Sequence, residues 1–205
     1  MLEIQIPEGF EHDCNNCQGL CCVALAIDKK SGFPINKEAG IPCDQLNTDA
    51  KDTAALCKCK IFATLSDKTH SLCIDFTCLG AGNTVSKYFK DLGMHWTTRP
   101  ENIDDAKWEL MKNNIFNAYL IFHKVFLYLY RIRNQRHPNN KIRYDAARKS
   151  VEKVSKELAG VLEAGTEEVD YEFWYENKFK PEMQISMHDA DTARLLDKLG
   201  ANKWW

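Results

Sequence analysis

Nine cysteines, all within residues 14–78, constrain this chain more than any other feature of its sequence. A segment this rich in cysteine predicts a metal-binding knot, a disulfide knot or a redox site. The 205-residue chain is otherwise ordinary, with 44% apolar and 27% charged residues, which excludes a wholly disordered or collagen-like protein.

The start of the sequence bears on the redox state of these thiols. Residues 1–8 contain no basic segment, no apolar run of signal-peptide length and no small-residue cleavage site. We therefore expect a cytoplasmic protein, in which thiols stay reduced and metal binding is favoured over disulfides. A disulfide-rich secreted protein is another hypothesis, but it would need a signal sequence. The odd number of cysteines also argues against a complete disulfide framework.

Charge and hydropathy limit the classes of partner. Lys plus Arg number 27 and Asp plus Glu 29, so the net charge of −2 gives no strong nucleic-acid signal. The apolar run at residues 115–130 is shorter than a bilayer span and contains His123 and Lys124, so we expect no transmembrane segment. Acidic residues interrupt a basic group in the second half, which indicates a solvated helix face: Lys141, Arg143, Arg148, Lys149, Lys153 and Lys156.

The second half of the chain reads as helical. Apolar spacing and end signals predict helices over residues 84–92, 103–134, 141–162 and 186–199. Thr84 is expected to cap the first, and Ser186 with Asp189 to form a capping box for the last. The aromatic residues 169–181 predict a strand or a packed loop, and residues 23–27 a short strand. The fold class is therefore mainly α, with an irregular metal-stabilised cysteine-rich N-terminal module, residues 1–98, packed on a C-terminal helical bundle, residues 99–205.

The cysteine spacings favour soft metals. Cys14 and Cys17 are separated by two residues, which lets both thiolates reach one metal ion around a tight turn. Adjacent Cys21 and Cys22 point apart, so they suit two neighbouring sites, or one ligand and one buried thiol. Eight thiolates would fill two four-cysteine zinc sites, or an iron–sulfur cluster and one zinc site, and leave one cysteine over. Thiolates favour zinc or iron over magnesium or calcium. His12 and His70 are the nearest substitute ligands, although solvated loop histidines are their ordinary interpretation.

This pattern resembles the cysteine-cluster proteins described as zinc- or iron-chelating domains. The shared elements are the spaced pair followed by the double cysteine, a Pro-Cys step at Cys43, a Cys-x-Ile-aromatic element at Cys59, and the closing pair Cys73 and Cys78. The sequence is more similar still to the cysteine-rich region that precedes some bacterial pentapeptide-repeat proteins, which also has Gly-Ala-Gly after the last cysteine. The resemblance covers residues 13–83. It departs from the family in having three residues between Cys17 and Cys21, and in having Phe62 where the closer relatives usually carry histidine.

The resemblance implies a metal site but no settled activity. Carried over residue by residue, it implies these metal ligands: Cys14, Cys17, Cys21, Cys22, Cys43, Cys59, Cys73 and Cys78. Cys57 is additional to this set.

Two functions follow from these observations. The leading one is a cytoplasmic protein whose cysteines chelate zinc or iron mainly as structure, with a helical region that serves a protein partner. The alternative is an iron–sulfur or thiol-based redox enzyme or sensor, for which Cys57 is the first candidate for a reactive thiol of low pKa. No substrate and no catalytic residue are indicated.

Overall fold

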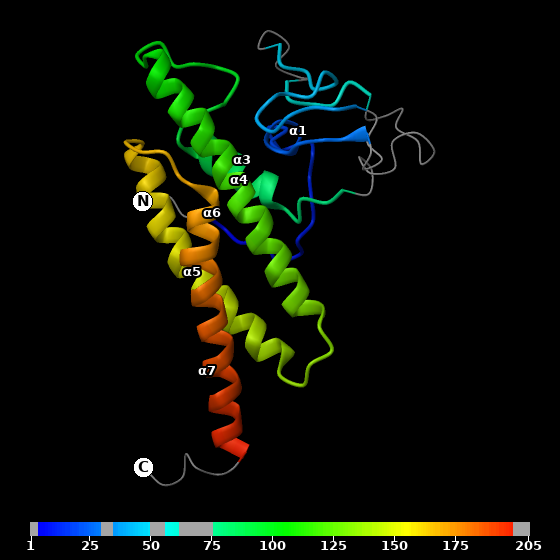
Figure 1. Cartoon of the computed structure of the whole chain (residues 1–205), viewed down its shortest axis with the longest axis vertical. Coiled ribbons are helices and arrows are strands. Elements are labelled where there is room, and N and C mark those ends of the chain that lie inside the picture. Colours follow the sequence, from blue (N-terminus) through cyan, green and yellow to red (C-terminus); the bar gives the residue numbers. More distant parts are fainter. Residues whose placement is uncertain (1–3, 30–34, 50–55, 62–75, 199–205) are drawn as a thin grey trace.

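The protein is described by a computed structural model over residues 4–29, 35–49, 56–61 and 76–198, so Cys73, His70 and Phe62 lie outside the described residues. It is mainly helical, as predicted, and β pairing in the described part is limited to isolated bridges. The elements, shown in Figure 1, are α1 (Cys21–Ala24), α3 (Ala81–Asp91), α4 (Asp105–Asn134), α5 (Asn140–Ala164), α6 (Tyr171–Trp174), a π-helical turn (Tyr175–Phe179) and α7 (Lys180–Lys198).

Helix α4 forms the centre of the molecule. The side chain of Asp104 caps its start by accepting a hydrogen bond from the Lys107 amide at 2.8 Å. Its last turn carries Arg131 and Arg133, whose charges favour the negative end of the helix dipole. The apolar run at residues 115–130 is buried on several faces, because α1, α3, α5 and α6 all pack against α4.

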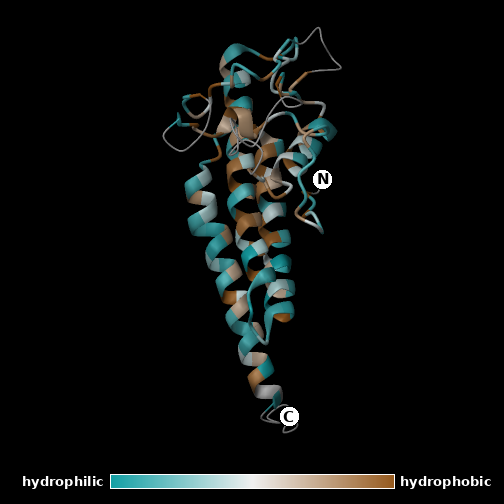
Figure 2. Cartoon of the chain, turned by 90° about the vertical axis from the view of Figure 1, so that its right-hand side faces the viewer, coloured by the Kyte–Doolittle hydropathy of each residue, from teal (hydrophilic) through white to brown (hydrophobic). Residues whose placement is uncertain are grey.

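Helices α5 and α7 complete the bundle. Helix α5 packs against both α4 and α7, and Phe179 from the π-helical turn meets Phe122 of α4 with ring centroids 5.9 Å apart. Figure 2 shows the apolar residues concentrated on the inner faces of these helices and hydrophilic residues on the outer faces. This is the pattern of helices held together by burial of one apolar stripe each.

The N-terminal part shares the core of the bundle. Ile4, Phe10, Leu20 and Leu79 are buried in the same apolar cluster as the α4 side chains. Phe10 packs edge-on against Phe126, with ring centroids 6.0 Å apart. Regular structure in this part is short, namely the four residues of α1 and isolated bridges such as Ile27 with Lys37. The division of the chain at residues 98 and 99 stays a prediction.

Two expectations for the C-terminal region are wrong. Residues 171–179 are helical instead of a strand or packed loop, because the Asp170 carboxylate caps them through the Phe173 amide at 2.9 Å. The last helix begins at Lys180, so Ser186 does not start it. The hydroxyl of Ser186 instead hydrogen-bonds that of Ser150 on α5, which makes it a link between two helices.

Two expectations near the cysteines are also corrected. Residues 23–27 do not form a strand, because Val23 and Ala24 belong to the helical turn α1 and Ile27 makes only an isolated bridge. Helix α3 starts at Ala81, three residues before Thr84, after Gly80 in the left-handed conformation. The stop at Gly93, with φ of +72°, agrees with the sequence.

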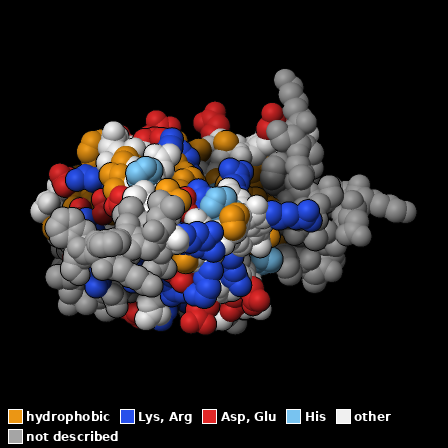
Figure 3. Space-filling model, turned by 90° about the horizontal axis from the view of Figure 1, so that it is seen from below, with side chains coloured by type: hydrophobic (Ala, Val, Ile, Leu, Met, Phe, Trp, Pro, Cys, Tyr) orange, Lys and Arg blue, Asp and Glu red, His pale blue; other side chains and the backbone are white. Residues whose placement is uncertain are grey.

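Several basic residues of α5 have acidic partners. Lys141 pairs with Asp145 at 2.7 Å, Arg148 with Glu152 at 3.2 Å, and Lys153 with Glu182 of α7 at 2.7 Å. Figure 3 shows Lys and Arg side chains next to Asp and Glu at the lower end of the molecule. These pairs match the predicted solvated face. No helix among the described residues is long and apolar enough to cross a bilayer.

Candidate metal centre

Five cysteines gather where the N-terminal loop meets helices α1 and α3. Cys14 and Cys17 lie in the loop before α1, Cys21 and Cys22 form the first turn of α1, and Cys78 lies just before α3. We call these five side chains the thiol cluster: Cys14, Cys17, Cys21, Cys22 and Cys78. In Figure 1 they belong to the blue and green segments around α1 and α3, beside α4.

Helix α3 holds the loop that carries the first two cysteines. The Asn83 side chain accepts from the Asp13 amide at 2.9 Å and donates to the Asp13 carbonyl at 2.7 Å. Ser86 accepts from the Gln18 amide at 2.8 Å, and its hydroxyl lies 3.7 Å from the Cys17 sulfur. The Trp96 indole donates to the Gln18 carbonyl at 2.7 Å. The positions of Cys14 and Cys17 are therefore fixed by side chains that follow the last cysteine in sequence.

Gly82 brings two distant cysteines together. A Cβ atom at this position would lie 2.7 Å from the Cys17 sulfur and 3.6 Å from the Cys78 sulfur. Both thiols therefore approach the same backbone atom of α3, although they are far apart in sequence.

The thiols of the cluster influence one another electrostatically. Partial burial, together with the charges of Cys17, Cys78 and Cys22, raises the pKa of Cys14 to about 11. Burial also raises the pKa of Cys17, an effect to which Cys78 adds. Because like charges at close range disfavour ionisation, each thiolate in the cluster would make its neighbours harder to ionise.

Cys21 and Cys22 share a hydrogen bond. Their sulfurs are 3.9 Å apart. The Cys21 thiol donates to Cys22, which raises the pKa of Cys21 and lowers the pKa of Cys22. Cys22 is further favoured as a thiolate by the ammonium of Lys37.

Lys37 also connects Cys43 to this group. Its ammonium donates to the carbonyls of Val23 and Glu38, each at 3.0 Å, and burial lowers its pKa while the charges of Cys22 and Cys43 oppose that shift. The Cys43 amide donates to the Cys22 carbonyl at 2.9 Å. Cys43 therefore lies on the Cys22 side of the thiol cluster.

Cys57 differs from the other cysteines. It is buried, adopts a φ of +61°, and its sulfur lies 4.0 Å from Nε2 of His95. Burial raises its pKa to about 12. An exposed thiol of low pKa is what the redox hypothesis requires of Cys57, and it has neither property.

Three more ligand candidates from the sequence are Cys59, Cys73 and His12. Cys59 pairs with Leu46 in an isolated bridge, and Cys73 lies outside the described residues. Nδ1 of His12 is 3.5 Å from the Thr77 hydroxyl on the exposed side of the segment before α3. Within the described ranges, no three Cys, His, Asp or Glu side chains already stand in a metal-coordinating arrangement.

Sequence reasoning missed Tyr119 and Lys37, which lie outside the cysteine motifs and interact electrostatically with the thiols. Tyr119 is fully buried on α4, and burial together with the charges of Cys21, Cys78, Cys17 and Cys22 raises its pKa. No motif marks a tyrosine so far along the chain. Its position in the predicted buried stripe of α4 was the one available signal.

His123 lies next to Tyr119 and gives a pH prediction. The two rings stack with centroids 5.9 Å apart, and burial lowers the pKa of His123, while a hydrogen bond to the Thr77 backbone opposes this shift. A histidine in the unfolded state has a pKa of about 6.5, so below that pH the unfolded state binds more protons than the folded state. The stability of the fold should therefore decrease as the pH drops from 7 to 5.5. His123→Gln should weaken this dependence in urea unfolding, with a remainder from His95, whose pKa burial also lowers. Equal pH slopes in both proteins would contradict the assignment.

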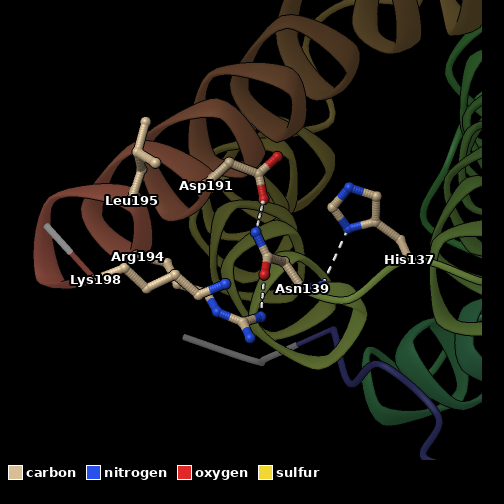
Figure 4. Close-up of a pocket in the computed structure, with 6 residues that line it drawn as sticks. All are labelled: His137, Asn139, Asp191, Arg194, Leu195 and Lys198. Atoms are coloured by element: carbon tan, nitrogen blue, oxygen red, sulfur yellow. Dashed lines mark hydrogen bonds between the residues drawn. The ribbon is translucent and has the colours of Figure 1, made fainter.

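A second group of polar residues lies at the far end of the bundle. Figure 4 shows Arg194 and Asp191 of α7 pointing to Asn139, the residue before α5. Asn139 donates to Asp191 at 3.0 Å, and Arg194 donates to the Pro138 carbonyl at 2.6 Å and to Asn139. These groups satisfy one another, so they tie the start of α5 to the end of α7.

No family model and no solved structure matches the chain. It is similar to the uncharacterized protein YybG of Bacillus subtilis (strain 168), with 30% identity over 132 residues, which are 63% of this chain and 41% of that protein. The chain thus matches less than half of the length of this relative.

Proposed function

We propose that this is a cytoplasmic metal-binding protein whose N-terminal cysteines chelate zinc as a structural ion. The observation that supports it best is the approach of Cys17 and Cys78 to the same backbone atom of α3 at Gly82. Two thiols so distant in sequence converge with three more, and burial and mutual repulsion oppose their ionisation. A divalent cation would offset that repulsion, and thiolate sulfur suits zinc.

The proposed ligands are drawn from the thiol cluster, Cys43 and Cys59, together with Cys73. Metal binding would require side-chain rotations within the cluster and would release the thiol protons. Zinc would supply a fixed tetrahedral centre that orders the surrounding loops. The orphaned hydroxyl of Tyr119 and the sulfur donors are consistent with a bound group at this place.

The helical part would serve a protein partner. Its described surface includes large exposed apolar side chains on α6 and α7, namely Phe173, Ile185 and Leu195. Exposed apolar side chains on a helical surface suit association with another protein more than with a charged polymer. This part of the proposal rests on surface chemistry alone.

An iron–sulfur or thiol-based redox role is the second candidate. One observation favours it: the pKa of Cys22 is lowered by the Cys21 thiol and by Lys37, which makes it the most readily ionised cysteine of the pair. Thiolate character is what makes a cysteine reactive. An iron–sulfur cluster would show itself by visible absorbance and by acid-labile sulfide.

Metal titration of two matched variants tests the proposal. Reduced protein is titrated with zinc under nitrogen, and bound zinc is counted after desalting. Because Cys17 faces the other thiols and Cys57 does not belong to the proposed ligands, Cys17→Ser should bind less zinc and bind it at least about tenfold more weakly. Cys57→Ser should bind as the unaltered protein does. Equal binding by all three proteins would reject the ligand assignment, and loss in both variants would make Cys57 a ligand.

A further inference from the structure

Tyr119 carries a buried hydroxyl group with no hydrogen-bond partner among the described residues. Its side chain is fully buried on α4, and its oxygen accepts and donates no hydrogen bond there. Buried polar groups in folded proteins are nearly always paired, and an unpaired one costs stability. The contrast with Tyr88 is direct, since the buried Tyr88 hydroxyl donates to the Ala159 carbonyl at 3.1 Å.

The helix that carries this hydroxyl packs against the helix that carries two cysteines of the thiol cluster. Helix α4 packs against α1, which carries Cys21 and Cys22. The ring of Tyr119 stacks on His123 with an interplanar angle of 12°, and that face is therefore filled. Tyr119 is also close enough to Cys21, Cys78, Cys17 and Cys22 for the charges of these four thiols to act on its hydroxyl.

We propose that the Tyr119 hydroxyl donates a hydrogen bond to a thiolate sulfur of the metal-loaded thiol cluster. This inference rests on the proposed function. A thiol sulfur is a weak acceptor, whereas a thiolate that ligates a metal carries negative charge and accepts strongly. Tyr119 is thus a positioning residue, which stabilises a ligand of the metal without touching the metal.

The proposal predicts opposite effects in the loaded and metal-free proteins. Tyr119→Phe removes the hydroxyl and keeps the ring on His123. In the metal-free protein it should leave the unfolding temperature unchanged or raise it, because without a thiolate partner the hydroxyl either stays unpaired or faces water where the cysteine-rich part unfolds. In the loaded protein it should weaken metal binding by about 10- to 100-fold, the usual effect of losing a hydrogen bond to a metal ligand.

Cobalt is the probe for this test, because sulfur-to-cobalt charge-transfer absorbance reports on the ligating thiolates. Tyr119→Phe should shift these bands and weaken cobalt binding relative to the unaltered protein. Tyr88→Phe is the matched control. It removes a paired hydroxyl that no cysteine influences, so it should lower the unfolding temperature and leave the cobalt spectrum unchanged.

Three results would contradict the proposal. An unchanged cobalt spectrum and affinity in Tyr119→Phe, with cobalt bound normally by the unaltered protein, would overturn the role of Tyr119 and leave the metal site standing. A lowered unfolding temperature in metal-free Tyr119→Phe would show that the hydroxyl is paired within the fold and would also overturn it. Failure of the unaltered protein to bind cobalt or zinc would reject the proposed function, and this inference with it.

Discussion

Removal of the metal is expected to unfold the first 80 residues and to leave the helical bundle largely intact. The described N-terminal part has little regular structure: the four residues of α1 and isolated bridges, supported by single contacts such as the Cys57 amide to the Asn47 carbonyl at 2.7 Å. Structural zinc contributes an apparent binding free energy of about 10–16 kcal/mol in small zinc-dependent folds, which far exceeds what such contacts supply. Although Ile4, Phe10 and Leu20 share the core of the bundle, helix α5 packs directly against α4 and α7, so we expect these helices to stay folded without the metal.

Hydrogen exchange followed by mass spectrometry directly measures whether the first 80 residues unfold when the metal is removed. With a chelator and reductant, peptides that cover the Ile27–Lys37 and Leu46–Cys59 bridges should lose their protection, and added zinc should restore it. Peptides from the middle of α4 and α5 are internal controls and should keep theirs. Unchanged protection across the N-terminal part after complete removal of metal would mean that the fold does not rest on a metal ion.

Substitution of one glycine is expected to disrupt the thiol cluster. In Gly82→Ala, the new Cβ would lie 2.7 Å from the Cys17 sulfur, a distance that real Cβ atoms essentially never show. The Cys17 side chain must therefore move, and the Cys78 sulfur at 3.6 Å limits where it can go. Alanine improves helix propensity by about 1 kcal/mol at most, which does not offset a displaced ligand. We expect zinc affinity to fall at least about tenfold.

Gly160→Ala is the matched control for this variant. Gly160 also lies within a helix, and no atom would come within 4 Å of its new Cβ. It should therefore stabilise the protein by about 0.5–1 kcal/mol in urea unfolding and leave zinc binding unchanged. If Gly82→Ala and Gly160→Ala bind zinc equally well, the close approach of Cys17 to α3 has no role in metal binding.

The helices that the sequence predicts well are those whose ends and apolar stripe agree. Helix α4 combines a long apolar run with an aspartate cap and arginines in its last turn, and α5 ends at Gly165 in the left-handed conformation. Each local signal points the same way, so tertiary packing only confirms it.

The aromatic residues after Val169 are harder to interpret because their pattern suits a strand as well as a helix. Besides the Asp170 cap, tertiary contacts favour the helix. Tyr171 and Tyr175 lie one helical turn apart, and the Lys124 ammonium of α4 is 5.0 Å from each ring centroid. Ser186 is a second case in which a local pattern misleads. Serine favours the first position of a helix, but in this fold its hydroxyl links α7 to α5. Local propensity is overridden where a side chain has a partner on another helix.

The candidate site, too, could be predicted from the sequence only in part. Spacing alone indicates that Cys14 and Cys17 can act together, and the structure places them in one cluster. Spacing does not show that Cys78 joins them, because this depends on the packing of α3 against the loop at Gly82. Tyr119 and Lys37 belong to no motif, and only the three-dimensional arrangement brings them to the thiols.

The most direct test of the central claim is elemental analysis together with a visible spectrum of protein purified without oxygen. The proposed function predicts a colourless protein with about two zinc ions per chain, which is the number that eight thiolates can hold in four-cysteine sites. Iron with sulfide and visible absorbance would support the redox alternative instead. No metal, with the cysteines oxidised, would contradict the account.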